Sequence, residues 1–269
     1  MPRFSANIST LFTDVDLPAR FARAAQAGFR GVEIQFPYAH DKTMLAERAK
    51  AAGVDVALIN LPAGDFSAGV RGIACLRSRV SEFRDGVGRG IEYARALGVP
   101  RLNCLAGLAP PKSNDALLRE TFLSNIRFAA GELGRHGMQL LIEPINTRTV
   151  PGFWLRNSGQ AIALIAEAAV PNIAVQYDLF HMQIMEGDLS RTLAESLPHI
   201  GHIQFADVPD RHEPGTGELN FSHLFGVIDR IGYTGWVGAE YMPSLPRTED
   251  TLGWLQPFLR REQQQQQQQ

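Results

Sequence analysis

Short apolar runs alternate with longer amphipathic stretches along almost the whole chain. The apolar runs are bounded by glycine, proline or polar residues, which is the pattern of buried strands. These predicted strands cover residues 3–8, 31–36, 54–60, 101–105, 139–143, 173–178, 200–205 and 236–241. The amphipathic stretches between and after them predict helices at residues 17–27, 42–52, 80–97, 115–134, 158–168, 189–197, 222–231 and 249–260.

Strict alternation of strands and helices predicts a parallel sheet, because right-handed crossovers connect successive strands. Eight such units are expected to close the sheet into a single-domain (β/α)8 TIM barrel. An open doubly wound sheet is the alternative, but no turn from strand to helix carries a GxGxxG pattern. We assign residues 1–262 to the barrel domain and expect the glutamine tail, residues 263–269, to be disordered.

One connection stands out by its length. Residues 61–76 link a predicted strand to the next helix and contain three glycines and a proline. Connections of this length in compact domains are often lids or binding loops. A solvated insertion without a function is the alternative that the sequence leaves open.

Composition and charge narrow the classes of partner. The formal net charge of -2 and dispersed basic residues give no support to binding of nucleic acid. No apolar run approaches the length of a membrane span, and the first residues lack the layout of a signal peptide. Two isolated cysteines, Cys75 and Cys104, are too few for a disulfide framework, so we expect a reduced, cytoplasmic setting.

Four oxygen-bearing side chains stand at the ends of four consecutive predicted strands. Glu143 comes just before Pro144, which cannot continue a sheet, and the following strands end with Asp178, Gln204 and Glu240. The carboxyl ends of barrel strands meet at one mouth, where barrel enzymes build their active sites. Each residue alone would suit a helix cap, a loop ion pair or, for Gln204, a simple hydrogen bond. Together the four indicate a site.

Three converging carboxylates without a cation would repel one another and tend to stay protonated. A divalent cation removes this conflict, and four oxygen ligands suit Mg²⁺ or Mn²⁺. The predicted metal ligands are therefore Glu143, Asp178, Gln204 and Glu240. No organic cofactor is expected.

Further side chains near these strand ends are candidates for substrate binding. His181 lies three residues beyond Asp178 and is expected to bind a substrate oxygen or stabilise developing charge. Arg211, in the loop after the seventh strand, suits a substrate carboxylate, although a surface ion pair would equally explain it. Asn60 ends the third strand and is expected to line the pocket. Glu33 and Asn103 are further polar residues at strand ends.

The sequence gives little support to other kinds of catalysis. The chain has no G-x-S-x-G elbow, no Walker loop and no H-E-x-x-H motif. A metal-dependent lyase or endonuclease on the same barrel is an alternative, but a nuclease would need more histidine ligands and a basic groove for DNA. A non-catalytic sugar-acid binding protein would not need two glutamates facing each other across a ligand. The sequence leaves a homo-oligomer open, because its large aromatic residues would suit either a subunit interface or the core.

Several longer stretches together resemble the hydroxypyruvate isomerase family, whose barrels are related to xylose isomerase. The stretches are AGFRGVE at residues 27–33, NLPAGD at 60–65, RGIAC at 71–75, IEPIN at 142–146, QYD and HMQ between 176 and 183, and EPGTGE at 213–218. The resemblance runs from Phe4 to about Phe258.

This resemblance implies an isomerase that interconverts hydroxypyruvate and 2-hydroxy-3-oxopropanoate (tartronate semialdehyde). It implies that Glu143 and Glu240 are the acid/base pair and that Glu143, Asp178, Gln204 and Glu240 hold the metal. The 2-oxo-tetronate isomerases are a sister group with a similar loop at residues 210–214. A ketose 3-epimerase is less favoured, because epimerases of this superfamily have histidine where this chain has Gln204.

Overall fold

The structure is a computed structural model, and it describes residues 1–266. Its strands are β1 (Arg3–Asn7), β2 (Gly31–Ile34), β3 (Asp55–Asn60), β4 (Arg101–Cys104), β5 (Gln139–Ile142), β6 (Ile173–Asp178), β7 (Ile200–Phe205) and β8 (Trp236–Ala239). The α-helices are α1 (Leu17–Gln26), α2 (Lys42–Ala52), α3 (Val80–Leu97), α4 (Asp115–Gly134), α5 (Ser158–Ala168), α6 (Leu179–Met185), α7 (Leu189–Ser196), α8 (Phe221–Arg230) and α9 (Gln256–Gln266).

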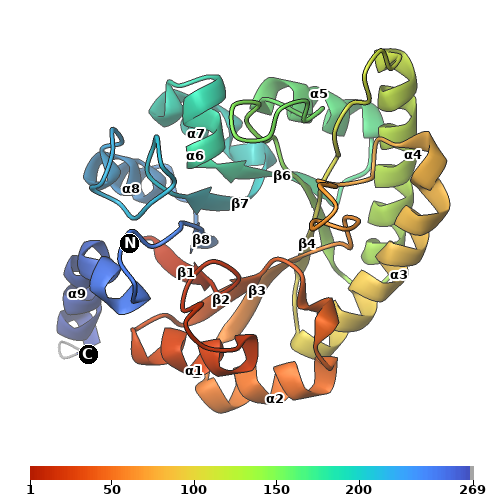
Figure 1. The fold of residues 1–269 in the computed structure, drawn as a ribbon. Helices are drawn as coiled ribbons and strands as arrows, with labels where there is room; N and C mark the ends of the chain where they lie inside the picture. Colours follow the sequence, from red (N-terminus) through yellow and green to blue (C-terminus); the bar gives the residue numbers. More distant parts are fainter. Residues whose placement is uncertain (267–269) are drawn as a thin grey trace.

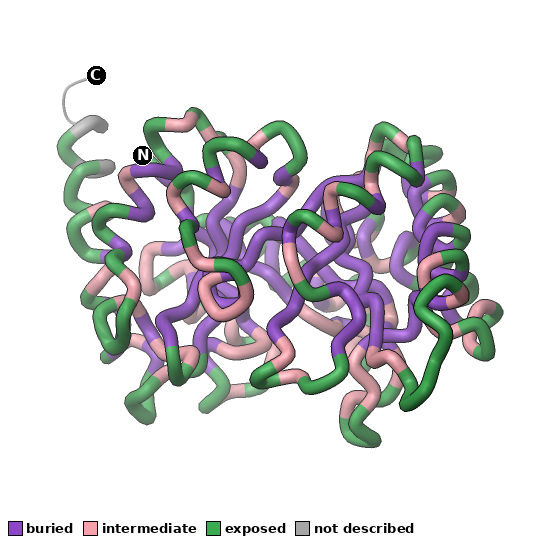
Figure 2. The backbone as a smooth tube through the Cα atoms, turned by 90° about the horizontal axis from the view of Figure 1, so that it is seen from above, coloured by how far each residue is buried: buried purple, intermediate pink, exposed green. Residues whose placement is uncertain are grey.

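The eight strands form a closed parallel barrel in the order of the sequence. Each strand pairs with its neighbour along the chain, and β1 closes the ring by pairing with β8. The helices surround the strands, as Figure 1 shows. In Figure 2 the central strands are buried while the outer helices expose one face to solvent. The predicted TIM barrel is confirmed.

The C-terminal region differs from the expectation of one helix over residues 249–260. A 3₁₀ helix, η4 (Thr248–Leu255), comes first and α9 follows it. Helix α9 continues to Gln266, into the tail that was expected to be disordered, and residues 267–269 lie outside the described part. The short helix α6, directly after β6, was not among the predicted helices, whereas α7 corresponds to the helix predicted at residues 189–197.

The barrel interior is divided into an apolar and a polar part. Because side chains of a strand alternate between its two faces, every second residue of each strand points inward. Leu58, Leu141 and Ala174 form a small buried cluster separate from the main core. Glu33 of β2 and His202 of β7 are buried polar residues of strands that are separated in the ring by β1 and β8.

The long connection 61–76 is fastened to the loop that follows β4. Gly72 and Ala106 form an isolated antiparallel bridge, and the N–H of Cys75 donates to the carbonyl of Ala106 at 2.8 Å. A Cβ atom on Gly72 would lie 2.5 Å from the carbonyl oxygen of Leu105, and one on Gly107 would lie 2.5 Å from the carbonyl oxygen of Gly72. Both contacts are too close for any residue other than glycine.

Candidate active site

Glu143 stands at the mouth of the barrel directly after β5. The residue is only 4% exposed, and the amide of Asn103 in β4 donates to Oε2 at 2.7 Å. Burial raises the pKa of Glu143 well above its usual value, and the charges of Glu240 and Asp178 raise it further. The site therefore favours the protonated form of this carboxyl.

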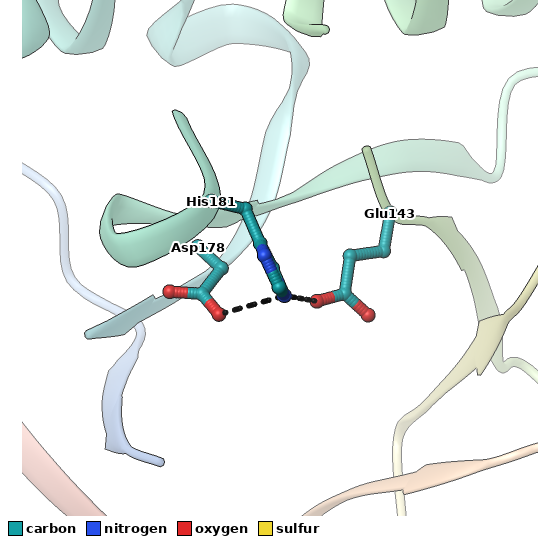
Figure 3. Close-up of side chains that lie close together, drawn as sticks. All are labelled: Glu143, Asp178 and His181. Atoms are coloured by element: carbon teal, nitrogen blue, oxygen red, sulfur yellow. Dashed lines mark ion pairs between the residues drawn. The ribbon is translucent and has the colours of Figure 1, made fainter. Parts of the chain in front are cut away.

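Asp178 and His181 approach Glu143 from the start of α6. Asp178 is the last residue of β6 and caps α6, since its carboxylate accepts from the N–H of Phe180 at 2.9 Å. One turn later, Nε2 of His181 lies 3.5 Å from Oδ2 of Asp178 and 3.9 Å from Oε1 of Glu143 (Figure 3). The candidate ligand atoms of these three residues lie within 4.8 Å of one another. Burial raises the pKa of Asp178, although Arg211 opposes the change.

Asn146 determines which nitrogen of His181 carries the proton. Its Oδ1 accepts from the N–H groups of Arg148 and Thr149, at 3.1 and 2.8 Å, so its Nδ2 faces Nδ1 of His181 at 2.7 Å. An amide nitrogen only donates, and Nδ1 must therefore accept. Burial lowers the pKa of His181 well below its usual value, and Arg211 lowers it further. Nη1 of Arg211 lies 3.4 Å from Nε2, a much longer contact than the 2.7 Å between Asn146 and Nδ1, so we infer a neutral imidazole whose Nε2–H points toward the carboxylates.

Glu240 follows β8 and faces the same mouth. Its Oε1 accepts from the side-chain amide of Asn7 at 3.0 Å and from that of Gln35. Burial raises the pKa of Glu240 to about 7, with Arg211 acting in the opposite direction and Asp178 adding to the increase. Near neutral pH, this carboxyl is balanced between its acid and base forms.

Arg211 joins carboxylates that come from different strands. Its Nη2 donates to Oε2 of Glu240 at 2.9 Å and to Oδ2 of Asp178 at 3.2 Å. The loop that carries it is organised by Asp207, whose carboxylate accepts from the N–H groups of residues 208, 215, 217 and 219. Arg211 has a φ of +61°, which is rare for a residue other than glycine. The loop thus holds Arg211 against the acidic residues.

Gln204 lies in a polar network below the mouth. Its amide donates to Oε2 of Glu33 at 2.7 Å, and its carbonyl oxygen accepts from Gln176 at 2.6 Å. Glu33 also accepts from Ser5 and lies 2.7 Å from Nε2 of His202. Burial acts to raise the pKa of Glu33, but His202 and the hydrogen bonds outweigh it and the pKa is lowered. The amide of Gln204 is therefore fixed in orientation by partners within the protein.

Gly238 leaves the space that this network needs. A Cβ atom at this position would lie 1.9 Å from Oε1 of Glu33. The sequence placed Glu33 at a strand end and left its role open; in the structure it is buried within β2 and paired with His202. Because β2 ends at Ile34, beyond Glu33, Gln35 lines the cavity.

A cavity of about 190 Å³ opens above these residues. It is lined by Gln35, Phe36, Asn60, Phe66, Arg71, Leu105, Glu143, Ile145, Val150, Phe153, His181, Arg211 and Glu240. The structure thus brings together His181, Arg211 and Asn60, the predicted substrate-binding residues, with both predicted catalytic glutamates. A larger hollow of about 860 Å³ lies at the opposite end, where the strands begin, and barrels carry stability rather than catalysis on that face.

The donor set is compatible with a divalent metal ion. Glu143 and Asp178 are buried carboxyls whose pKa values burial raises, so ionising both at neutral pH would require a further positive charge, which a divalent cation would supply. The close group of candidate ligands comprises Glu143, Asp178 and His181; Glu240 lies outside it and is joined to Asp178 through Arg211. The carbonyl oxygen of Gln204, the fourth member of the predicted set, already accepts from Gln176. His181 also lies within this group, but its inferred Nε2–H is a donor and not a ligand in that form.

Several residues of the site were not singled out from the sequence. Asn7 and Gln35 position Glu240, Asn146 positions His181, and Arg71 lines the cavity from the connection 61–76. Asn7 ends its strand with a polar residue, which is the signal that identified Glu143 and Asp178. Arg71 gave no such signal because it lies within an irregular loop.

Comparison with known proteins agrees with this geometry. Residues 21–258 match the family model described as xylose isomerase-like TIM barrel. The chain belongs to this family. It is 48% identical to hydroxypyruvate isomerase of Escherichia coli (strain K12) over 258 residues, 96% of this chain and 100% of the relative. It is 46% identical to 2-oxo-tetronate isomerase of Cupriavidus necator over 261 residues, 97% of this chain and 100% of the relative.

Two solved structures superpose on this chain over almost its whole length. The structure titled AP endonuclease, family 2, from Brucella melitensis matches with a TM-score of 0.93 and 44% identity, over 96% of this chain and 99% of that chain. L-ribulose 3-epimerase matches with a TM-score of 0.77 at 21% identity, over 98% and 97%, which shows the fold alone. The predicted family and the predicted enzyme class, an isomerase, are confirmed by the curated relatives.

Proposed function

We propose that this isomerase interconverts hydroxypyruvate and 2-hydroxy-3-oxopropanoate through an enediolate. The observation that carries the proposal is the pair of buried glutamates, Glu143 and Glu240, which both line one small cavity and have raised pKa values. They follow β5 and β8, which are separated by β6 and β7 in the barrel. A substrate in the cavity would therefore have one carboxyl on each side.

The proton transfers follow from this arrangement. One glutamate, as carboxylate, removes a proton from the hydroxymethyl carbon of hydroxypyruvate and leaves an enediolate. The other glutamate, as acid, governs return of a proton to the neighbouring carbon. The hydroxyl proton moves from the first oxygen to the second, so the product has an aldehyde and a secondary hydroxyl and no atom is gained or lost. Raised pKa values allow one carboxyl to be an acid while the other is a base.

The surrounding side chains would hold and polarise the substrate. The inferred Nε2–H of His181 would donate to the oxygen on which charge develops. Arg211 and Asn60 line the cavity and would contact the oxygens of the substrate. Apolar side chains, including Phe66 and Phe153, cover the cavity on other sides and would limit access of water to the enediolate.

Glu143, Asp178, Gln204 and Glu240 would hold a divalent cation, Mg²⁺ or Mn²⁺. Such an ion would supply Lewis acid chemistry at the substrate oxygens. The order of the two glutamates depends on the direction of the reaction. Both curated relatives span this chain, and the 2-oxo-tetronate isomerase relative makes a four-carbon acid the second candidate substrate.

The partner of this enzyme is thus a small acid. Among the described residues, no helix combines the length and the apolar character that crossing a membrane requires. The cytoplasmic setting and a homo-oligomer stay predictions from the sequence.

An NMR assay in D₂O tests the proposal. Hydroxypyruvate and a four-carbon 2-oxo-tetronate are each supplied with Mg²⁺, with Mn²⁺ and with a chelator. We expect faster turnover of hydroxypyruvate and entry of deuterium at the carbon that receives the proton. Preference for the four-carbon acid would transfer the same mechanism to that substrate. Absence of turnover with both acids under all conditions would refute the proposal.

A further inference from the structure

Two arginines line the cavity, and they differ in their surroundings. Arg211 is held by Glu240 and Asp178, and these charges, with that of Glu143, outweigh burial and raise its pKa. Arg71 has no carboxylate of the described residues within 4.0 Å of its guanidinium. The nearest acidic residue in its loop, Asp65, is exposed and accepts hydrogen bonds from Ser67 and Ala68 instead.

The backbone of Arg71 is held in place. Gly72, the next residue, forms the bridge to Ala106 in the loop after β4 and contacts it too closely for any other residue type. The half-buried guanidinium of Arg71 lies 4.8 Å from the ring centroid of Phe66. Its Nη1 donates to the carbonyls of Phe66 and Val70, both at 2.9 Å. The side chain is therefore ordered before any ligand arrives.

The remaining donors of Arg71 are available to a ligand. The hydrogen bonds found for it use Nη1 alone, and a guanidinium offers five N–H groups on three nitrogens. Phe66, whose ring lies against the guanidinium, carries no charge, nor do Phe36 and Leu105, which line the same cavity. A cation in such surroundings attracts an anion more strongly than one exposed to water.

We propose that Arg71 binds the carboxylate of the substrate, and that Arg211 is engaged by ion pairs with Glu240 and Asp178. The proposal rests on the proposed function, because it takes the ligand to be a short hydroxy or oxo acid. The acid would lie with its carboxylate against Arg71 and its reacting carbons between Glu143 and Glu240. A planar carboxylate matches two N–H donors of a guanidinium.

The test compares a charged ligand with its neutral counterpart. Glycerate has the carboxylate and two hydroxyls but no carbonyl, so it cannot be isomerised, and glyceramide replaces the carboxylate with an amide. We expect Arg71→Gln to weaken binding of glycerate by about 30-fold or more in calorimetry and to leave glyceramide within about 3-fold. The same variant should raise KM for hydroxypyruvate by a similar factor and change kcat much less.

Matched variants separate recognition of the anion from support of the loop. Arg71→Lys retains the charge and a donor for the loop carbonyls, and we expect it to recover part of the lost affinity for glycerate. Arg148→Gln removes an exposed arginine near the mouth and should leave both affinities within about 2-fold. Equal losses of affinity for glycerate and for glyceramide in Arg71→Gln would overturn the proposal, because a merely structural role of Arg71 weakens binding of both ligands.

The outcomes also distinguish this proposal from the proposed function. If the unaltered enzyme turns over hydroxypyruvate while Arg71→Gln keeps full affinity for glycerate, the role of Arg71 is refuted and the isomerase remains. If the unaltered enzyme binds glycerate through Arg71 but isomerises neither acid, the proposed function is refuted and the anion site remains.

Discussion

Nδ2 of Asn146 lies 2.7 Å from Nδ1 of His181, and both side chains are buried. Because the oxygen of this amide is occupied by backbone N–H groups of residues 148 and 149, the contact sets the tautomer of the histidine. A residue outside the catalytic pair thus decides whether His181 presents a donor or a lone pair to the substrate.

The tautomer gives a first prediction. Asn146→Asp places a carboxylate beside Nδ1, which would then carry the proton and leave a lone pair on Nε2. We expect kcat to fall by about 100-fold, as when an oxyanion donor is removed. Thr149→Val is the control, because it removes one hydroxyl bond to Asn146 and leaves the N–H bonds in place. ¹⁵N NMR of the imidazole should show the change; an unaltered tautomer in Asn146→Asp would contradict the inference.

The two glutamates give a second prediction. Glu143→Gln and Glu240→Gln should each lower kcat by about 10²–10⁴-fold, because an amide cannot transfer the proton. Circular dichroism should show an unchanged fold. Glu218→Gln removes an exposed carboxylate from the loop after β7 and should retain normal turnover. Near-normal turnover in either glutamine variant would remove that residue from the catalytic pair.

Stability against pH gives a third prediction. The pKa of Glu240 is raised to about 7 in the folded, metal-free protein, above its ordinary value of 4.5. A raised pKa in the folded state stabilises the fold at low pH, and this stabilisation is lost as pH rises through about 7. In a chelator, the free energy of unfolding should therefore fall between pH 6 and pH 8, by about 1 kcal/mol from this group.

Denaturant titrations of Glu240→Gln provide the comparison for that pH effect. The variant has no titrating group at this position, so its stability should depend less on pH over the same interval. If the free energy of unfolding changed equally with pH in the two proteins, Glu240 would be shown not to titrate in this interval.

Space in the barrel interior gives a fourth prediction. Gly238→Ala would place a methyl group 1.9 Å from Oε1 of Glu33, which Ser5, His202 and Gln204 hold in place. We expect a loss of about 3 kcal/mol or more in the free energy of unfolding. Gly131→Ala, at an open and exposed position of α4, should instead stabilise by about 0.5–1 kcal/mol. If Gly238→Ala left the free energy of unfolding unchanged, Glu33 would be shown to move without cost.

The metal gives a fifth prediction. Asp178→Asn should raise the Kd for Mn²⁺ by about 10-fold or more, because an amide oxygen is a weaker donor than a buried carboxylate. Electron paramagnetic resonance of free Mn²⁺ measures this without an activity assay. Asp210→Asn, which changes an exposed acid of the nearby loop, serves as the control. Equal affinity in both variants would place the ion elsewhere.

Periodicity was sufficient to predict the barrel, because every strand of a closed parallel sheet is a short apolar run between glycines and polar residues. The same reasoning found Glu143, Asp178 and Glu240, since polar residues that end such runs must meet at one rim. It did not find the partners of Glu33 or the orientation of Gln204. These depend on which inward residues of different strands share a level, and strand register does not follow from local pattern.

The roles of loop residues were harder still to predict from the sequence. Arg71 reaches the cavity because its connection is fastened to the loop after β4, and that contact joins segments far apart in the sequence. The end of the chain was predicted as one helix because its apolar residues repeat with helical spacing. That spacing does not distinguish a 3₁₀ turn followed by an α-helix from one continuous helix.

The close contact of Gly72 with the loop after β4 also has a consequence for variation and design. Because neither Gly72 nor Gly107 tolerates a side chain toward the other, the two loops keep one fixed spacing. A change of substrate length is then expected to come from the tip at residues 64–70, beyond the contact. Grafting either loop alone from a relative should fail where grafting both together succeeds, so the pair behaves as a single exchangeable module.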